Sequence, residues 1–493
     1  MADRTVTPPI ELAGTGERLI GAVSPVSPAL VAELQAICAT LTDVDAAAEA
    51  SRDWWPLALH WALDGRVPRR AGAVVRPSSV EDVSAVLAAC VRASVPVTAA
   101  GGRSGVCGGS VPVFGGVVAD LTLLKGIVEV DDVSGLVGVR AGTFGPDLED
   151  ELRRHHGMTV GHYPQSYELA TVGGWVACRG AGQYSTRYGK IEQMVAALEV
   201  VLADGSVVRT GGSPAAATGP DLTQLFVGSE GLLGIITTVW LRTHSLPEAE
   251  RRAAYRFDTL GAGFEACRRL VRRGATPAVL RLYDVIESAA DRGGDGTDCV
   301  LLVLDEGDPA IVDATMAVVA DACQNGAPAD DELVARWMQH RNDTSALQAL
   351  TKKGYVVDTM EVAAPWSRLD GLVAAVTEAQ RAVPHTLVSS CHLSHSYLDG
   401  ACLYFTFAAK PPADEVEAAY VALWNAGQRA ALRAGGNLSH HHGVGLNRAR
   451  FAGEALGGGH QVLAAIKQAL DPAGILNPGK FGLDSPFGQV AWP

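Results

Sequence analysis

A glycine-rich run directly after an apolar strand restricts the fold most strongly. Residues 95–109 read VPVTAAGGRSGVCGG, in which five glycines fall within nine residues. Glycine lets backbone N–H groups approach and curl around an anion such as a pyrophosphate. The run lacks the GxGxxG spacing of a nicotinamide site, and no Gly-Lys-Ser/Thr follows as in a Walker loop. Taken alone, it is either a plain loop or a phosphate cradle.

The chain around this run mixes helices and strands. Apolar periodicity and turn residues predict strands at 73–77, 95–102, 116–124 and 136–142, helices at 79–94 and 147–157, and a hairpin over 197–210 that turns at Asp204-Gly205. The Ala-rich residues 30–50 are predicted to be helical. A boundary near 244–255 precedes further alternating helices and strands. We therefore expect an N-terminal helical segment (1–70), a first domain (71–243), a second α+β domain (244–436) and a C-terminal segment (437–493).

Composition excludes several classes of partner. The net charge is −14, which argues against nonspecific binding to nucleic acid or to anionic membranes. The nine cysteines are scattered without a CxxC pair, as in reduced proteins of the cytoplasm. The N-terminus lacks a secretory signal, and no apolar stretch is long enough to span a bilayer. We expect a cytoplasmic protein.

Two more stretches carry small and hydroxylated residues suited to a polar cofactor. In residues 161–189, a turn-rich path contains Pro164, Ser166, Thr171, Gly173 and Gly174. Hydroxyls and glycine amides suit phosphates and the polar edge of a flavin ring. Residues 221–237 run from a helix through a Gly-Ser-Glu-Gly turn to an apolar strand. The candidate cofactor residues there are Gly228, Ser229, Glu230, Gly234 and Ile235. The alternative for this third stretch is a tight helix-to-strand connection.

The three stretches, in this order, resemble the FAD-binding domain of flavoproteins related to p-cresol methylhydroxylase and vanillyl-alcohol oxidase. The resemblance implies an α+β protein with a PCMH-type FAD-binding domain of two α/β subdomains, and a C-terminal α+β substrate (cap) domain with an antiparallel sheet. Its loop would bind FAD through Gly101, Gly102, Arg103, Ser104 and Gly105. Some relatives carry a flavin-linking histidine in this loop. The loop here carries Arg103 in place of such a histidine, so we expect FAD to be bound non-covalently. Arg103 either pairs with the pyrophosphate or points to solvent.

The C-terminal half resembles the alkyldihydroxyacetonephosphate synthase branch through "YLDGACLY" (397–404), "LSHHHGVG" (438–445), "VLRLYD" (279–284), "APW" (364–366) and "DPAGILNPGK" (471–480). In that branch the flavin N5 forms an adduct with an acyl-dihydroxyacetone phosphate, and a fatty alcohol replaces the acyl group without net redox change. The resemblance implies that Tyr404, His441 and His442 are catalytic, with His440 beside them pointing away. It also places Arg281, and more weakly Arg341, in the substrate pocket, to which we add His392.

Each of these residues also has a simpler interpretation. Tyr404 on an apolar strand suits a core tyrosine, and Arg281 suits an ion pair between domains. A metal site at the three histidines is disfavoured, because adjacent residues project in different directions. His392 and His395 would lie on opposite faces of a strand. The related D-2-hydroxy-acid dehydrogenases carry a second metal-binding histidine where Tyr404 stands here. We expect no metal, and a histidine-dependent rate with an apparent pKa near about 6.5.

Three functions remain open. The first is an FAD-dependent enzyme resembling alkylglycerone-phosphate synthase. The second is an FAD-dependent oxidoreductase acting on a D-2-hydroxy acid or related alcohol. The third is a non-catalytic flavin-binding protein. The expected partner is a small-molecule substrate, with transient membrane contact if that substrate is a lipid. Nucleic acid is not expected, and a homodimer is one oligomeric option.

Overall fold

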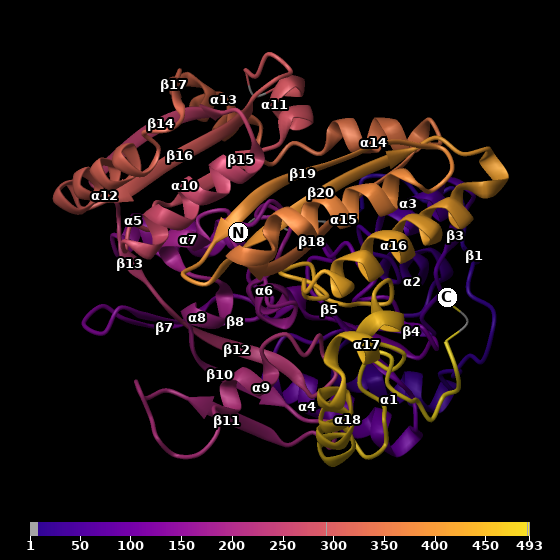
Figure 1. The fold of residues 1–493 in the computed structure, drawn as a ribbon. Coiled ribbons are helices and arrows are strands. Elements are labelled where there is room, and N and C mark those ends of the chain that lie inside the picture. The colour runs from indigo at the N-terminus through magenta and orange to yellow at the C-terminus, as the bar shows by residue number, and fades with distance from the viewer. Residues whose placement is uncertain (1–7, 292, 491, 493) are drawn as a thin grey trace.

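Three β-sheets form the frame of the molecule. The computed structural model describes residues 8–492 except 292 and 491. A four-stranded and a five-stranded sheet lie on one side, and a seven-stranded sheet lies on the other (Figure 1). This arrangement is the predicted α+β fold.

The four-stranded sheet leads directly into the glycine run. Its order is β2 (Ala39–Leu41), β4 (Ala73–Arg76), β6 (Val117–Asp120) and β5 (Val97–Ala100). The last three are parallel, and α4 (Val80–Ala93) connects β4 to β5. Helix α4 begins with a capping box, in which Ser79 and Asp82 each accept the other's backbone N–H. Strand β5 ends one residue before Gly101.

The helix predicted over residues 30–50 is wrong in its middle. Helix α1 (Pro28–Ile37) ends, β2 pairs antiparallel with β4, and α2 (Val44–Ala50) begins only after Asp43, which caps it. Thr40 and Thr42 interrupt the alanines, and β-branched residues favour a strand over a helix. Pairing with strand β4 therefore makes residues 39–41 a strand and not a helix.

The five-stranded sheet is antiparallel throughout. Its order is β11 (Val207–Gly211), β10 (Val195–Val201), β12 (Ile235–Arg242), β8 (Leu136–Arg140) and β7 (Ile127–Asp131). Strands β10 and β11 form the predicted hairpin, with Gly205 at a φ of +87° in its turn. The helices of this part are α5 (Gly145–His155), α6 (Val172–Ala177), α7 (Ser185–Tyr188), α8 (Ile191–Met194) and α9 (Leu222–Phe226). A short pair joins β9 (Met158–Thr159) to β13 (His244–Ser245).

The seven-stranded sheet is also antiparallel. Its order is β17 (Ala327–Ala329), β14 (Ala249–Phe257), β16 (Cys299–Gly307), β15 (Val279–Tyr283), β19 (Thr386–Ser396), β20 (Gly400–Ala409) and β18 (Val356–Pro365). Helices α10 (Leu260–Arg272), α12 (Pro309–Ala322), α15 (Leu369–Arg381) and α16 (Val416–Arg433) cover one face (Figure 1). The remaining helices are α11 (Val285–Asp291), α13 (Glu332–His340) and α14 (Ser345–Lys352). Leu372 and Val376 of α15 join the buried cluster of Leu403 and Phe405 on β20.

The N-terminal and C-terminal parts of the described chain pack around this frame. The N-terminal part adds α3 (Pro56–Leu63) and the short pair β1 (Gly16–Glu17) and β3 (Arg66–Val67). After α16 the chain forms the histidine loop, which we define as residues 437–448, then α17 (Ala452–Leu456) and α18 (Gly458–Leu470). Leu476 then forms a parallel bridge with Val97 on β5. None of the helices in the described residues is both long and apolar enough to span a membrane.

Candidate active site

Residues from all three sheets line one cavity of about 590 Å³. It gathers nineteen of the twenty-two predicted site residues. They are Gly101, Gly102, Arg103, Ser104, Gly105, Pro164, Ser166, Thr171, Gly173, Gly174, Glu230, Gly234, Ile235, Arg281, Arg341, His392, Tyr404, His441 and His442. Gly228, Ser229 and His440 do not line it. Residues far apart in sequence therefore meet around one cavity.

The glycine run lies tightly against the 164–174 segment. A Cβ on Gly102 would lie 1.8 Å from the backbone oxygen of Leu169, and one on Gly101 would lie 2.2 Å from Thr171 Oγ1. Thr171 caps α6 through the N–H of Gly174 at 3.3 Å. Any larger side chain would push the two segments apart. The glycines are thus required by close backbone approach, and both segments face the cavity.

Unpartnered polar atoms in this cavity fit a large polar cofactor. Among the described residues, buried atoms that line the cavity without a protein partner are Asp53 Oδ2, Trp54 Nε1, Ser110 Oγ, both ring nitrogens of His162, Trp175 Nε1 and Ser394 Oγ. Buried polar groups normally find a partner, so these groups are available to a bound molecule. Burial lowers the pKa of His162 to about 3, which leaves its ring neutral. The donors, acceptors and glycine cradle together fit FAD.

Arg103 does not point to solvent. Its backbone has a φ of +53°, and its guanidinium donates to the backbone oxygen of Glu49 on α2 and lies 3.9 Å from the Glu49 carboxylate. Its side chain is only 16% exposed. Burial lowers the pKa of Arg103, against the effect of Glu49. The guanidinium thus joins the cavity wall to the N-terminal part of the chain.

The third stretch serves mainly as a connection. Gly228 and Ser229 were predicted to bind the cofactor, and the structure places both outside the cavity. Gly228 has a φ of +83° and packs against Arg179, while a Cβ on Gly234 would lie 2.4 Å from Val200. The tight helix-to-strand turn explains these glycines.

Glu230 is the member of that stretch with a polar role. Its half-buried carboxylate accepts the backbone N–H of Gly445 at 2.8 Å and that of Val444. Gly443 and Gly445 have positive φ and no room for a Cβ. Glu230 therefore fastens the end of the histidine loop to the FAD-binding part.

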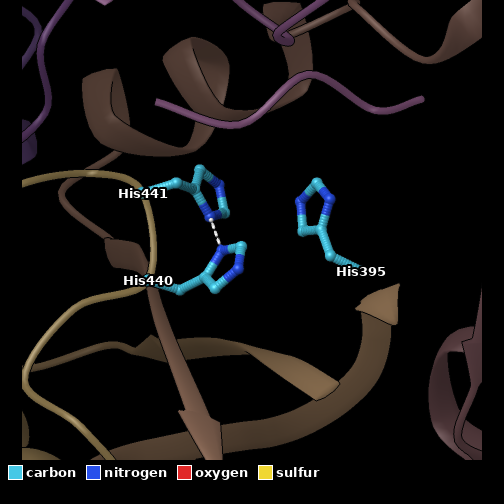
Figure 2. Close-up of side chains that lie close together, drawn as sticks. All are labelled: His395, His440 and His441. Atoms are coloured by element: carbon cyan, nitrogen blue, oxygen red, sulfur yellow. Dashed lines mark hydrogen bonds between the residues drawn. The ribbon is translucent and has the colours of Figure 1, made fainter. Parts of the chain in front are cut away.

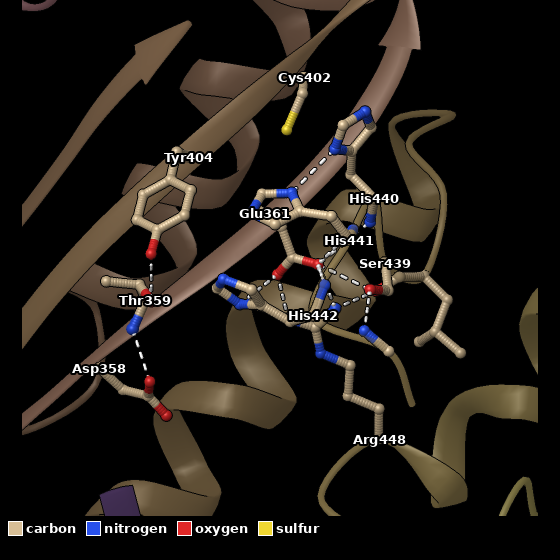
Figure 3. A network of polar contacts seen from close by, with 12 residues as sticks. Asp358, Thr359, Glu361, Cys402, Tyr404, Ser439, His440, His441, His442 and Arg448 are labelled. Atoms are coloured by element: carbon tan, nitrogen blue, oxygen red, sulfur yellow. Dashed lines mark hydrogen bonds and ion pairs between the residues drawn. The ribbon is translucent and has the colours of Figure 1, made fainter. Parts of the chain in front are cut away.

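A second carboxylate, Glu361 on β18, organises the histidines (Figure 3). Glu361 Oε1 accepts the backbone N–H groups of His440 at 3.1 Å, His441 at 3.1 Å and His442 at 2.8 Å, and the hydroxyl of Ser439 at 2.6 Å. Three consecutive N–H groups thus turn toward one oxygen. The backbone curls around the carboxylate, and the three imidazoles stay close together, with ring centroids 5.1 Å apart for His440 and His441 and 4.5 Å apart for His441 and His442.

Arg448 and His442 complete this carboxylate site. Arg448 donates to both Glu361 oxygens, and His442 Nδ1 lies 2.9 Å from Oε2. Burial opposes ionisation of Glu361, yet Arg448 and His442 hold the pKa of Glu361 well below its usual range. Sequence reasoning missed Glu361 and Arg448. The only available signal was the presence of two charged residues, Asp358 and Glu361, inside the apolar strand VVDTMEVAA (356–364).

His395 on β19 joins the histidine loop (Figure 2). The Nδ1 atoms of His440 and His441 are 2.8 Å apart, and the His395 ring centroid lies 5.0 Å from that of His440 and 5.1 Å from that of His441. His440 turns away from the cavity, as expected, but toward this cluster. Burial holds the pKa values of all three imidazoles well below the ordinary histidine value, so the rings are neutral.

Ring nitrogens of His395, His440 and His441 lie within 4.8 Å of one another, so this cluster could hold a metal ion. The premise that neighbouring histidines diverge is therefore wrong for His440 and His441. The expected separation of His392 from His395 is also wrong, because both line the cavity. The register of β19 against β20 shifts between Leu393 and His395, and such a bulge re-aims the side chains that follow it.

Tyr404 faces the cavity and not the core. Its ring stacks on His392 at 5.0 Å and 25°, and it meets His442 edge-on at 5.5 Å. Its hydroxyl donates to Thr359 Oγ1 at 3.0 Å (Figure 3). Burial raises the pKa of Tyr404, so the phenol keeps its proton and can donate it.

Arg281 and Arg341 give the cavity a positive side. Their guanidinium carbons lie 5.4 and 5.7 Å from the Trp337 ring centroid. Arg281 Nη2 lies 2.6 Å from His392 Nε2, and Arg341 donates to Gln183 Oε1 at 3.0 Å. Within the described part of the chain neither pairs with a carboxylate, which disagrees with the interface ion pair considered for Arg281. Two such guanidinium groups suit an anionic ligand.

Comparison with known proteins identifies the family. The family described as "FAD linked oxidases, C-terminal domain" matches residues 246–481, and the "FAD binding domain" family matches residues 71–211. An uncharacterized FAD-linked oxidoreductase, YgcU of Escherichia coli O157:H7, is 34% identical over 433 residues, covering 83% of this chain and 88% of YgcU. This chain belongs to the FAD-linked oxidases.

Two further similarities relate this FAD-linked oxidase to a synthase sequence and to the fold of a solved structure. The alkyldihydroxyacetonephosphate synthase of Trypanosoma brucei brucei is 28% identical over 476 residues, covering 87% of this chain and 76% of that protein. The crystal structure of p-cresol methylhydroxylase with substrate bound has the same fold, with a TM-score of 0.77 at 19% identity over 94% of this chain and 99% of that one. The FAD-linked oxidase is therefore an FAD-dependent enzyme with the fold of the p-cresol methylhydroxylase and vanillyl-alcohol oxidase superfamily.

Proposed function

We propose that this FAD-linked oxidase exchanges the acyl group of an acyl-dihydroxyacetone phosphate for an alkyl group. The supporting observation is the combination of side chains around one cavity. Arg281 and Arg341 suit a phosphate, and neutral imidazoles and a protonated phenol suit proton transfer. Apolar Pro56 and Leu59 of α3 and Leu347 of α14 line the same cavity and suit an acyl or alkyl chain.

The roles of the chain's own residues follow from their positions. FAD, when bound, supplies an electron-accepting ring that activates the carbon next to the substrate carbonyl. Arg281 and Arg341 would hold the phosphate. His441 and His442 would take a proton from the substrate carbon or the incoming alcohol and return it to the leaving group. Tyr404 would donate its hydroxyl proton to a substrate oxygen. We further propose that FAD is held non-covalently.

The exchange is tested by isotope incorporation. The holoenzyme is incubated without oxygen with acyl-dihydroxyacetone phosphate and a radiolabelled long-chain alcohol. Label in an alkali-stable ether product, with the flavin oxidised at the end, supports the proposal. Permanent bleaching of the flavin without ether product would contradict it.

A second function is oxidation of a D-2-hydroxy acid or related alcohol. The 34% identity to an FAD-linked oxidoreductase favours it, and the two arginines would suit a carboxylate as well as a phosphate. Anaerobic bleaching of the flavin by a D-2-hydroxy acid would establish this activity in place of the exchange.

A further inference from the structure

A carboxylate reaches Arg281 indirectly, through the ring of His392. His392 Nδ1 lies 2.7 Å from Glu287 Oε2, and His392 Nε2 lies 2.6 Å from Arg281 Nη2. All three residues line the cavity, and the His392 side chain is only 7% exposed. A buried imidazole therefore lies between a carboxylate and a guanidinium.

This order of contacts permits only one form of the His392 ring. A guanidinium has N–H donors and no acceptor, so His392 Nε2 accepts a hydrogen bond from Arg281. The single proton of a neutral ring is then on Nδ1, which donates to Glu287. An imidazolium is excluded, because it would direct a second N–H at Arg281 Nη2 over 2.6 Å.

The fold places Glu287 opposite His392 by means of Asp284. Asp284 Oδ1 accepts the N–H of Glu287 at 2.8 Å at the start of α11, and its Oδ2 accepts the N–H of Cys391 on β19 at 2.7 Å. One side chain thus fixes both the helix that carries Glu287 and the strand that carries His392. The Ser390 hydroxyl also donates to Glu287 Oε1, at 2.9 Å.

We propose that Glu287 is a positioning residue, which holds His392 in its Nδ1–H tautomer so that this ring orients the Arg281 guanidinium toward the anionic group of the substrate. Two further contacts fix the guanidinium. Arg281 Nε donates to the Tyr283 hydroxyl at 3.2 Å, and the guanidinium carbon lies 5.4 Å from the Trp337 ring centroid. Within the described part of the chain Arg281 Nη1 has no hydrogen-bond partner, so it can donate to the anion. The inference rests on the proposed function only for the place of that anion.

Charge explains why the carboxylate acts through an imidazole. A carboxylate in direct contact with Arg281 would form an ion pair and compete with the substrate anion for the same donors. The His392 ring keeps the two charges apart, and its hydrogen bond still fixes the direction of the guanidinium. His392 also stacks on Tyr404 at 5.0 Å and 25°. The tautomer that Glu287 selects therefore fixes the ring against which the phenol packs.

The first experiment needs no substrate. Nitrogen NMR of the ¹⁵N-histidine-labelled holoenzyme reports the tautomer of His392, whose signals are assigned through His392→Phe. We expect a neutral wild-type ring with its proton on Nδ1. Glu287→Gln should retain this form, because its amide oxygen can still accept, whereas Glu287→Leu should shift the ring toward the Nε2–H form. Glu306→Leu removes a buried carboxylate of β16 that does not line the cavity, and it should leave these signals unchanged.

The second experiment measures anion binding. The holoenzyme is titrated with dihydroxyacetone phosphate and, separately, with 2-hydroxy-2-methylpropanoate, a 2-hydroxy acid without an oxidisable C–H bond, while the flavin absorbance is followed. Each anion that binds the wild type should bind Glu287→Leu roughly tenfold more weakly. Glu287→Leu should have no further effect in the His392→Phe background, because the carboxylate acts only through that ring.

Two results would overturn the positioning role. One is a wild-type His392 ring that is an imidazolium or carries its proton on Nε2. The other is equal anion affinity in the wild type and Glu287→Leu. If the expected tautomer depends on Glu287 but no ether product forms, the positioning role stands and the proposed exchange fails. If ether product forms while His392 is an imidazolium, the exchange stands and the positioning role fails.

Discussion

Glu361 and Arg448 form an ion pair with neither side chain exposed to solvent, and Arg448 Nη1 lies 3.1 Å from Glu361 Oε1. The same carboxylate accepts three backbone N–H groups of the histidine loop. One buried pair thus fixes the shape of the histidine loop.

Glu361→Gln should destabilise the protein strongly, because it leaves Arg448 charged and without its partner. Breaking a buried ion pair typically costs about 3–5 kcal/mol. Urea unfolding of the holoenzyme measures the change. Glu265→Gln, which breaks an exposed pair with Arg268, is the control and should cost less than about 1 kcal/mol. Equal costs for the two variants would show that Glu361 is not structurally central.

Tyr404→Phe should retain the fold and the flavin while turnover falls about a hundred- to ten-thousandfold. Tyr404 lines the cavity, and the only partner of its hydroxyl in the described residues is Thr359, so removal of the hydroxyl leaves the ring stacking intact. Flavin absorbance and steady-state rates measure the two effects. Near-normal turnover would show that Tyr404 serves in packing and not in catalysis.

In the profile of turnover against pH, the fall on the acid side (the acid limb) should occur below pH 6.5. Burial holds the pKa of His441 well below that value, so the neutral base persists as pH falls through 6.5 and is protonated only at lower pH. The environment of His441 therefore shifts the expected apparent pKa to below that of ordinary histidine. His441→Asn should lower turnover strongly and remove the limb, while His385→Asn, on an exposed turn, should leave both unchanged. A limb at 6.5 in the wild type would assign the titration to another group.

Gly102→Ala should weaken FAD binding, because the new Cβ would lie 1.8 Å from the backbone oxygen of Leu169. The flavin content of the purified protein measures the loss. Gly371→Ala, in the exposed part of α15 with no atom near the new Cβ, should keep full flavin content.

Acid precipitation of the wild type should release the flavin to the supernatant. Flavin that remains on the precipitated chain would contradict non-covalent binding.

Asp53→Asn should stabilise the holoenzyme more at pH 8 than at pH 4. Burial raises the pKa of Asp53 to about 7. Between about pH 4 and 7 the unfolded chain has already lost this proton while the folded chain keeps it, so folding stability falls as pH rises through that window. Thermal unfolding at both pH values tests the sign. Asp399→Asn, in the exposed turn after β19, should show no such difference.

Sequence reasoning reached the local features and missed those that depend on distant contacts. The glycine run, the Asp204-Gly205 hairpin and the histidine loop are contiguous, so their residues could be recognised. Glu361 acts on backbone groups almost eighty residues later, and His395 reaches the cavity only because a bulge turns it. Asp53 belongs to an N-terminal segment whose place beside the cofactor cavity no local pattern predicts.

Two carboxylates from different parts of the molecule fasten the histidine loop: Glu361 on β18 accepts the N–H of His442, and Glu230 before β12 accepts the N–H of Gly445. This has a consequence for recombining this enzyme with its relatives. A chimera that takes the cap of one protein and the cofactor part of another receives the two anchors from different parents. The histidine loop of the chimera then fits only if its backbone N–H groups can donate to both carboxylates at once. Exchange of substrate specificity should therefore succeed when the histidine loop and β18 come from the same parent. The turn at 228–230 must also still present its carboxylate to that loop.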